Sequence, residues 1–318
     1  MDWNMNLART AAVGVGFLCL LLLGEPARAD GPAATSKPTT ASAPAAGIRL
    51  AKYGQAQGQE FYNYGLNIVP PWADGGKLLI NFPEHLEYMP GTRGILRYSD
   101  KDAKGHWEVA ADGLSAKLDV ESVTEPGVKV QGEAKVVGPE RIEVSMAIVN
   151  GSKKKLGDIR PLYCFQYRGL TGFPQWVDNL KHTFFIQGGK LVALSDIKTP
   201  QDSKVKAGSV KDSPQKNDSE FAAKQGGWIE EGVDASISIV TSLNDKRCLV
   251  LAWTPGKSAF SNANIPCLHA DPYYGTIEPG QTAVAKAVIT LSERPKEEIV
   301  KELQKEGAGA AVKRKDSP

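Results

Sequence analysis

The sequence predicts an all-β protein, a large antiparallel β-sandwich with one short C-terminal helix. Apolar and polar residues alternate with a period of two in several stretches, as in Ile142, Val144, Met146 and Ile148, the pattern of a sheet with one buried face. Clusters of Gly, Pro, Asp and Asn separate these stretches at short intervals, as turns require. Helical periodicity is nearly absent between them, so a sandwich or barrel is favoured over βαβ units.

The expected strands follow one another from residue 77 to residue 292. They lie at 77–83, 94–100, 114–125, 128–138, 141–152, 158–169, 182–196, 235–256 and 282–292. Two of these ranges indicate hairpins, because a short polar or glycine-rich pair joins two apolar runs in IQGGKL and SLNDKR. We expect roughly twelve strands in all. The one helix is predicted at RPKEEIVKELQKEG, residues 294–307, where Pro stands at the start and Gly at the end.

The N-terminal segment predicts export. Arg9 precedes an apolar run from Ala11 to Leu23, and the small-x-small sequence Ala27-Arg28-Ala29 follows it. These are the three parts of a secretory signal peptide, so we expect cleavage after residue 29 and a periplasmic or extracellular protein. The apolar run is shorter than the about 20 residues that a membrane helix needs, and we expect no membrane span in the mature chain.

The remaining chain divides by composition. Residues 30–47 are nearly all Ala, Pro, Ser, Thr and Gly and predict a flexible linker, because such a segment has little to bury. Residues 48–294 form the predicted β-sandwich domain, and residues 295–318 a short helix with a disordered tail. The long polar stretch 198–227 indicates either a lid over a site or a mobile insertion; its low apolar content favours the insertion.

Charge and cysteine content narrow the class of protein. The formal net charge is +2, with 38 Lys and Arg against 36 Asp and Glu, and no basic stripe of the kind that binds nucleic acid is present. The mature chain would keep Cys164, Cys248 and Cys267. An odd number allows one disulfide at most, and we expect none, because two of the cysteines stand in apolar strands. We expect a monomer.

The stretch CLHADP holds the most reactive residue types of the domain. Cys267, His269 and Asp271 alternate along the chain, so in an extended conformation they face the same way. All three are zinc ligand types, and a Cys–His nucleophile pair is a second interpretation. A histidine that holds a loop by hydrogen bonds is the third. We expect the third and no cofactor, because no second Cys/His pair accompanies the stretch; zinc or another divalent metal is the alternative.

Aromatic residues fall largely in or beside the predicted loops, and they indicate a carbohydrate ligand. They are Trp72, Trp107, Tyr163, Tyr167, Phe173, Trp176, Trp228, Tyr273 and Tyr274. A flat ring beside polar side chains suits the apolar face of a sugar. The expected substrate contacts are Arg168, Trp176, Asp178 and Asn179, with Tyr274 from the 262–275 loop. The alternative is that most of these rings fill the ends of the sandwich.

The closing segment resembles the C-terminal end of galactose-mutarotase-like supersandwich proteins. A strand ending in LVLAWTPG leads through SNANIPCLHADPYYG to the turn in TIEPGQT and a final strand, AVAKAVITL. The stretch EVSMAIVNGSKKKLGD is similar to a central strand and turn of the same fold. The resemblance implies a supersandwich over residues 47–294. Epimerases of that group use two histidines and a carboxylate base, whereas their mid-chain histidine motif is absent here, so mutarotase chemistry is not expected.

These observations predict an exported carbohydrate-binding β-sandwich protein without an assigned reaction. A sugar-active enzyme, an epimerase or one like the polysaccharide lyases, is the first alternative, and it would need an acid–base pair. Its catalytic candidates are His182, His269, Asp271 and Tyr273. A structural or interaction protein of the cell envelope is the second alternative.

Overall fold

The computed structural model describes residues 47–53, 64–72, 74, 76–89, 93–97, 105–175, 179–201, 203–214, 226–262 and 265–312. The predicted signal peptide and nearly all of the predicted linker lie outside these residues. Among the helices of the described part, none is both long and apolar enough to span a membrane.

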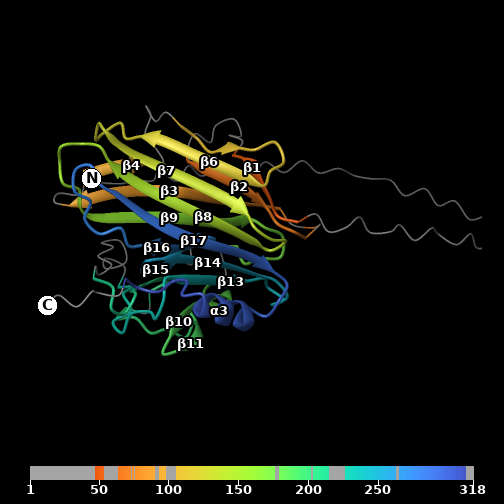
Figure 1. The fold of residues 1–318 in the computed structure, drawn as a ribbon. Helices are drawn as coiled ribbons and strands as arrows, with labels where there is room; N and C mark the ends of the chain where they lie inside the picture. Colours follow the sequence, from red (N-terminus) through yellow and green to blue (C-terminus); the bar gives the residue numbers. More distant parts are fainter. Residues whose placement is uncertain are drawn as a thin grey trace, which may run out of the picture. The chain divides into compact units, whose positions relative to one another are not determined.

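Two antiparallel sheets make up the described part of the chain, so the predicted all-β class is confirmed (Figure 1). Sheet A has the order β1 (Arg49–Lys52), β2 (Gly65–Val69), β3 (Lys77–Met89), β9 (Gly157–Gly169), β16 (Cys267–Pro272), β15 (Gly256–Asn262) and β12 (Val205–Ser209), with β4 (Arg93–Arg97) also paired to β3. Sheet B has the order β11 (Lys190–Ala193), β10 (Thr183–Gln187), β13 (Ile237–Thr241), β14 (Cys248–Thr254), β17 (Thr282–Ser292), β8 (Arg141–Asn150), β7 (Val128–Val136), β6 (Ser115–Glu121) and β5 (Glu108–Val109).

The main hydrophobic core lies between the two sheets. The alternating residues of β8 that predicted a buried face, Ile142, Val144, Met146 and Ile148, are at most 2% exposed. A group of three rings joins the sheets, with Phe82 and Tyr163 from sheet A and Trp253 from sheet B. Their ring centroids are 4.6 to 5.4 Å apart, a separation at which aromatic pairs attract.

Both predicted hairpins are present. β10 and β11 pair in register from Phe184 opposite Ala193 to Gln187 opposite Lys190. The two residues of the turn, Gly188 and Gly189, have φ of 60° and 75°, values that glycine adopts without the steric cost that a side chain brings. β13 and β14 also pair antiparallel, across the polar connection 242–247.

The predicted C-terminal helix is α3 (Lys296–Lys305). Glu297 and Glu298 lie in its first turn and Lys305 in its last, charges that favour the helix dipole. Its buried face, made of Ile299, Val300 and Leu303, packs on the side of β13 and β14 that faces away from the main core. The second described helix, α1 (Asn179–His182), is a single turn before β10.

Two stretches expected to be loops contain strands instead. The CLHADP stretch is β16, which lies between β9 and β15 inside sheet A and is buried along its whole length. The polar stretch 198–227 contains β12, an edge strand paired to β15; residues 202 and 215–225 of this stretch lie outside the described part. Both strands are short and buried on two faces, and each contains a Gly or Pro, residue types that predict a turn.

Candidate functional site

A row of side chains crosses sheet A on the face opposite the main core. Backbone register places Asn81 of β3 beside Cys164 of β9, and Cys164 beside His269 of β16. The alternate residues Phe165 and Leu268 belong to the core between the sheets. Because successive side chains of a strand point to opposite faces, the row faces away from that core.

Three members of this face form a compact group, here called the cysteine–histidine cluster: Cys164, Cys267 and His269. Cys267 Sγ lies 3.2 Å from His269 Nε2, and one potential ligand atom from each of the three lies within 4.8 Å of the others. The two cysteines are each 2% exposed and the histidine 4%. Such a buried set of two sulfurs and one imidazole nitrogen is chemically a metal-ligand set or a thiol–imidazole pair.

The members of the cluster change one another's protonation. A hydrogen bond with Cys164 and the nearby imidazole lower the pKa of Cys267 to about 5, against the opposing effect of burial. The same hydrogen bond, together with burial, raises the pKa of Cys164 well above its usual range. Burial lowers the pKa of His269, but the Cys267 thiolate beside it raises the value to about 9. Cys267 and His269 therefore each favour the charged form of the other.

Further polar groups of β3 adjoin the cluster. Burial raises the pKa of Glu84, whose carboxyl lies in hydrogen-bonding contact with the Cys164 thiol. Burial and the charge of Arg97 lower the pKa of His85 to about 4, which keeps that imidazole neutral. Asn81 is fully buried. Neither amide atom of Asn81, nor Glu84 Oε2, has a hydrogen-bond partner among the described residues.

Asp271, the third residue of the predicted metal set, has a different role in the structure. Its Oδ1 accepts a hydrogen bond of 3.1 Å from the backbone N–H of Tyr163, and Ser258 Oγ donates to its Oδ2 over 3.2 Å. The carboxylate is thereby held between β9 and β15. Cys267, His269 and Asp271 do share one face of β16, but the side chain that completes the compact group is Cys164 of the neighbouring strand.

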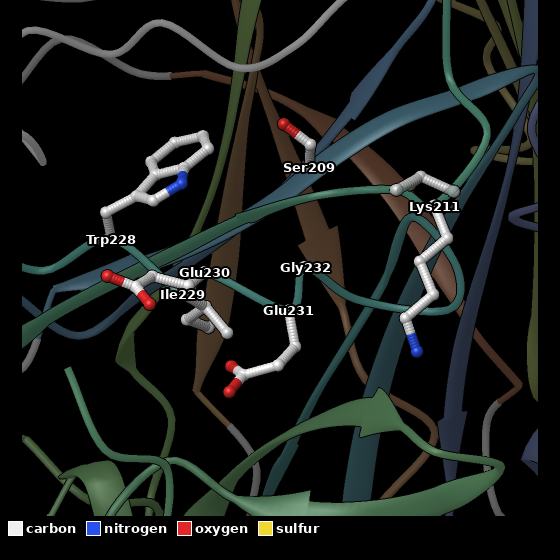
Figure 2. Close-up of a pocket in the computed structure, with 8 residues that line it drawn as sticks. Ser209, Lys211, Trp228, Ile229, Glu230, Glu231 and Gly232 are labelled. Carbon is white, nitrogen blue, oxygen red and sulfur yellow. The ribbon is translucent and has the colours of Figure 1, made fainter.

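A pocket with a volume of about 290 Å³ lies beside edge strand β12 (Figure 2). Residues 226–233 run parallel to β12, with bridges from Ala207 to Trp228 and from Val210 to Val233. The pocket is lined by Ser209, Val210, Lys211, Trp228, Ile229, Glu230, Glu231 and Gly232. In Figure 2 the indole of Trp228 and the side chain of Lys211 stand at opposite sides of the pocket. It thus combines one aromatic ring with charged side chains of both signs.

The pocket and the cluster are connected through Phe260. This ring packs with Trp228 against Val205 and Ala207 of β12. It also lies edge on against the imidazole of His269, with 4.9 Å between the ring centroids. One half-buried side chain therefore forms part of the packing of both features.

Two of the predicted substrate contacts are hydrogen-bonded within the protein. Asn179, 1% exposed, accepts a hydrogen bond from the Tyr167 hydroxyl and donates to the carbonyls of Asn262 and Ile265. This arrangement ties α1 to the segment after β15. The hydroxyls of Tyr274 and Tyr163 lie 2.7 Å apart in the core.

Of the other three predicted substrate contacts, the structure describes one. Arg168 is exposed at the end of β9 on the face that carries the cluster. Trp176 and Asp178 lie outside the described residues. As substrate contacts, all five residues stay predictions.

The four catalytic candidates do not form one site. His269 and Asp271 share a face of β16, as described above. His182 is half-buried beside sheet B, where its Nδ1 lies 3.2 Å from Thr241 Oγ1. Tyr273 is half-buried after the end of β16. A common acid–base role for the four therefore has no geometric support.

Several residues of the cysteine–histidine cluster and of the pocket beside β12 were not singled out from the sequence. Cys164 was interpreted as an apolar strand residue, although its neighbours Tyr163 and Phe165 supply the opposite, core-facing side of β9. Trp228 was one of the aromatic residues noted in loops, without a partner. Asn81, Glu84, Glu230 and Glu231 carry no signal in the sequence beyond being polar.

No family model matches the chain, and no curated protein sequence matches it either. Among solved structures, it is similar to a polysaccharide lyase with 10% identity and a TM-score of 0.40, over 81% of this chain and 34% of that one. It is also similar to a putative aldose 1-epimerase from Escherichia coli K12, with 9% identity and a TM-score of 0.36, over 78% of this chain and 100% of that one. A third similar structure is a GalM/aldose epimerase homologue from C. elegans, with 10% identity and a TM-score of 0.31, over 63% of this chain and 70% of that one.

Two of these structures are aldose-epimerase-like by their names, the group that the closing segment resembles. The chain spans about a third of the length of the polysaccharide lyase. At these TM-scores the similarity carries no conclusion about activity, substrate or site.

Proposed function

We propose that this protein is an exported carbohydrate-binding protein and that the sugar lies in the pocket beside β12. The observation that carries the proposal is the half-buried indole of Trp228 in the wall of a pocket of about 290 Å³. Ligand pockets combine apolar and aromatic walls with a few placed polar groups. The apolar face of one sugar ring would lie against the indole.

The charged residues of the same pocket supply the polar contacts that a sugar needs. The exposed carboxylates of Glu230 and Glu231 would accept hydrogen bonds from sugar hydroxyls. Lys211 would donate a hydrogen bond to the sugar, although its Nζ also pairs with Asp234 Oδ1 at 2.7 Å. Among the described lining residues there is no histidine, so the pocket offers contacts for binding and lacks the usual imidazole of an acid–base pair.

Glycan binding by the Trp228→Ala variant tests this proposal. The wild-type chain is screened on a glycan array, and the best ligand is then titrated by calorimetry. Removal of the indole should weaken binding by roughly tenfold to hundredfold, since aromatic hot spots contribute about 2 kcal/mol or more. Leu243→Ala is the matched control, because Leu243 is 55% exposed and lies on the connection between β13 and β14, outside the pocket.

The carboxylates give a second, independent measurement. Glu230→Gln and Glu231→Gln should each weaken binding, whereas Glu278→Gln, at an exposed turn away from the pocket, should not. The proposal fails when no glycan binds the wild-type chain. It also fails when the Trp228 variant binds as tightly as the wild type.

Export is a separate part of the proposal and rests on the N-terminal segment alone. N-terminal sequencing of the protein recovered from outside the cytoplasm should begin at Asp30. Recovery of the uncleaved chain in the cytoplasm would contradict it.

A further inference from the structure

The cysteine–histidine cluster has the composition and the spacing of a zinc site. Tetrahedral zinc holds thiolate sulfur at about 2.3 Å and imidazole nitrogen at about 2.0–2.1 Å, which separates its ligand atoms by about 3.5–3.8 Å. One ligand atom each from Cys164, Cys267 and His269 lies within 4.8 Å of the other two, and the sulfur of Cys267 is 3.2 Å from Nε2 of His269.

Sheet register holds the three side chains in place. Cys267 and His269 point to the same side of β16, because they are two residues apart. Cys164 comes from the adjacent strand β9, directly opposite His269. Strand β16 is also tied from its other side, where the hydroxyl of Ser238 in sheet B donates to the carbonyl of His269 over 2.7 Å. The ligand set therefore belongs to the centre of a sheet and needs no loop to form.

Buried polar groups beside the cluster point to a bound ion as well. Asn81, aligned with Cys164 on the next strand, is fully buried with both amide atoms unpartnered among the described residues. Glu84 contacts the Cys164 thiol and has a second buried oxygen, Oε2, that is likewise unpartnered in the described part. Unpaired buried polar groups are costly, and coordination of a metal would give the Glu84 carboxylate a partner.

From this geometry we propose that Cys164, Cys267 and His269 bind one zinc ion, with the Glu84 carboxylate at the fourth position. Two sulfurs and one imidazole suit zinc better than calcium or magnesium, which take oxygen ligands. Since the three ligands are at most 4% exposed, the site is structural and joins β3, β9 and β16. The proposal does not depend on sugar binding at the Trp228 pocket.

Metal content and cobalt spectroscopy test the site. The chain is purified under reducing conditions and analysed for zinc; the expected result is one equivalent per chain. After removal of zinc, Co²⁺ should produce the intense visible bands of tetrahedral coordination and a near-ultraviolet thiolate-to-cobalt band. Chelation should lower the melting temperature, because binding energy at a structural site is folding energy.

Substitutions assign the ligands. Cys164→Ser and Cys267→Ser should each reduce the thiolate-to-cobalt band, and His269→Gln should shift the visible bands. Each of these three substitutions should weaken zinc binding by more than about 100-fold, because the loss of a residue that only hydrogen-bonds to a metal ligand already costs about 10- to 100-fold. Cys248→Ser is the matched control, because that buried cysteine lies on β14 of sheet B, outside the cluster, and it should leave zinc binding and the cobalt spectrum unchanged. Glu84→Gln should weaken binding and keep the thiolate-to-cobalt band.

Three results would overturn the proposal. The first is a folded, reduced wild-type chain that takes up neither zinc nor cobalt. The second is a cobalt spectrum unchanged by the cysteine substitutions. The third is a disulfide between Cys164 and Cys267, found by mass spectrometry of the unreduced chain, since it would occupy the same sulfurs. Circular dichroism of each variant separates loss of a ligand from loss of the fold, and the wild-type measurement stands without any variant.

Discussion

The ring of Phe260 lies edge on against the imidazole of His269, with 4.9 Å between the ring centroids. Phe260 also packs, as does Trp228, against the cluster of Val205 and Ala207 on β12. Phe260 therefore contacts both the imidazole and the β12 residues against which Trp228 packs. The proposed sugar pocket lies beside edge strand β12, and the proposed zinc site lies on the inner strands β9 and β16, with β15 between them.

Replacement of Phe260 tests this connection. Phe260→Ala should lower both the zinc affinity and the sugar affinity. It should also lower the free energy of unfolding. Replacement of a fully buried Phe by Ala costs about 3–5 kcal/mol, and about half of that is expected here because Phe260 is half-buried. Urea denaturation and the two titrations measure these effects. Phe184→Ala is the control: Phe184 is half-buried on sheet B and should cost stability with both affinities unchanged. Full retention of both affinities in Phe260→Ala would contradict the connection.

Asn150 should be one of the most sensitive polar positions. Its amide N–H groups donate to the carbonyls of Lys154 and Ile277, over 2.8 and 3.0 Å, and its Oδ1 accepts from the backbone N–H and the hydroxyl of Ser152. The side chain is fully buried. Asn150→Ala should reduce the free energy of unfolding by about 2–4 kcal/mol, because several buried groups lose their partners together. Asn67→Ala, at a half-buried position of β2 whose side chain donates one hydrogen bond, should cost far less. Similar losses for the two variants in urea denaturation would refute this prediction.

The fold was predictable from the sequence where one face of a strand is buried. The alternation at 141–152 predicted β8, which the structure bounds at Arg141–Asn150, and the final strand and the C-terminal helix were predicted equally closely. β1, β2, β5, β12, β15 and β16 were missed, all of them short, and the last three also contain Gly, Pro or Asn. Their place in the sheets depends on long-range pairing, which a short local pattern does not specify.

The candidate site was predictable only along a single strand. Spacing placed Cys267 and His269 on one side of an extended chain, and the structure does the same. Their neighbour Cys164 lies far away in the sequence and meets them only because β9 pairs with β16. Trp228 stood out as aromatic, but its place beside β12 depends on a parallel bridge to Ala207. Contacts of this kind follow from topology, which a single sequence does not specify.

The hydroxyl pair of Tyr163 and Tyr274 provides a test of whether Tyr274 contacts a substrate. Both side chains are buried, and their oxygens are 2.7 Å apart. Tyr274→Phe should cost about 1–3 kcal/mol of unfolding free energy, because the hydroxyl of Tyr163 keeps its burial and loses its partner. The double Phe variant should recover part of this loss, which a double-mutant cycle in urea denaturation would show. Sugar affinity should stay unchanged; a loss as large as that of Trp228→Ala would place the ligand at Tyr274 instead.

The thiol of Cys248 should make stability fall at high pH. Burial, and to a lesser degree the charge of Glu140, raises the pKa of Cys248 from its ordinary 9.0 to about 12. Above pH 9 the thiol of the unfolded chain loses its proton while the folded chain retains it, so ionisation favours the unfolded state. This contribution is fully present below pH 9 and is lost as the pH rises towards 12; three pKa units correspond to roughly 4 kcal/mol. Lysines and other tyrosines titrate in the same range, so the quantity to measure is the difference in unfolding free energy between wild type and Cys248→Ala. That difference should shrink steadily as the pH rises above 9, and a constant difference would show that Cys248 ionises equally in both states.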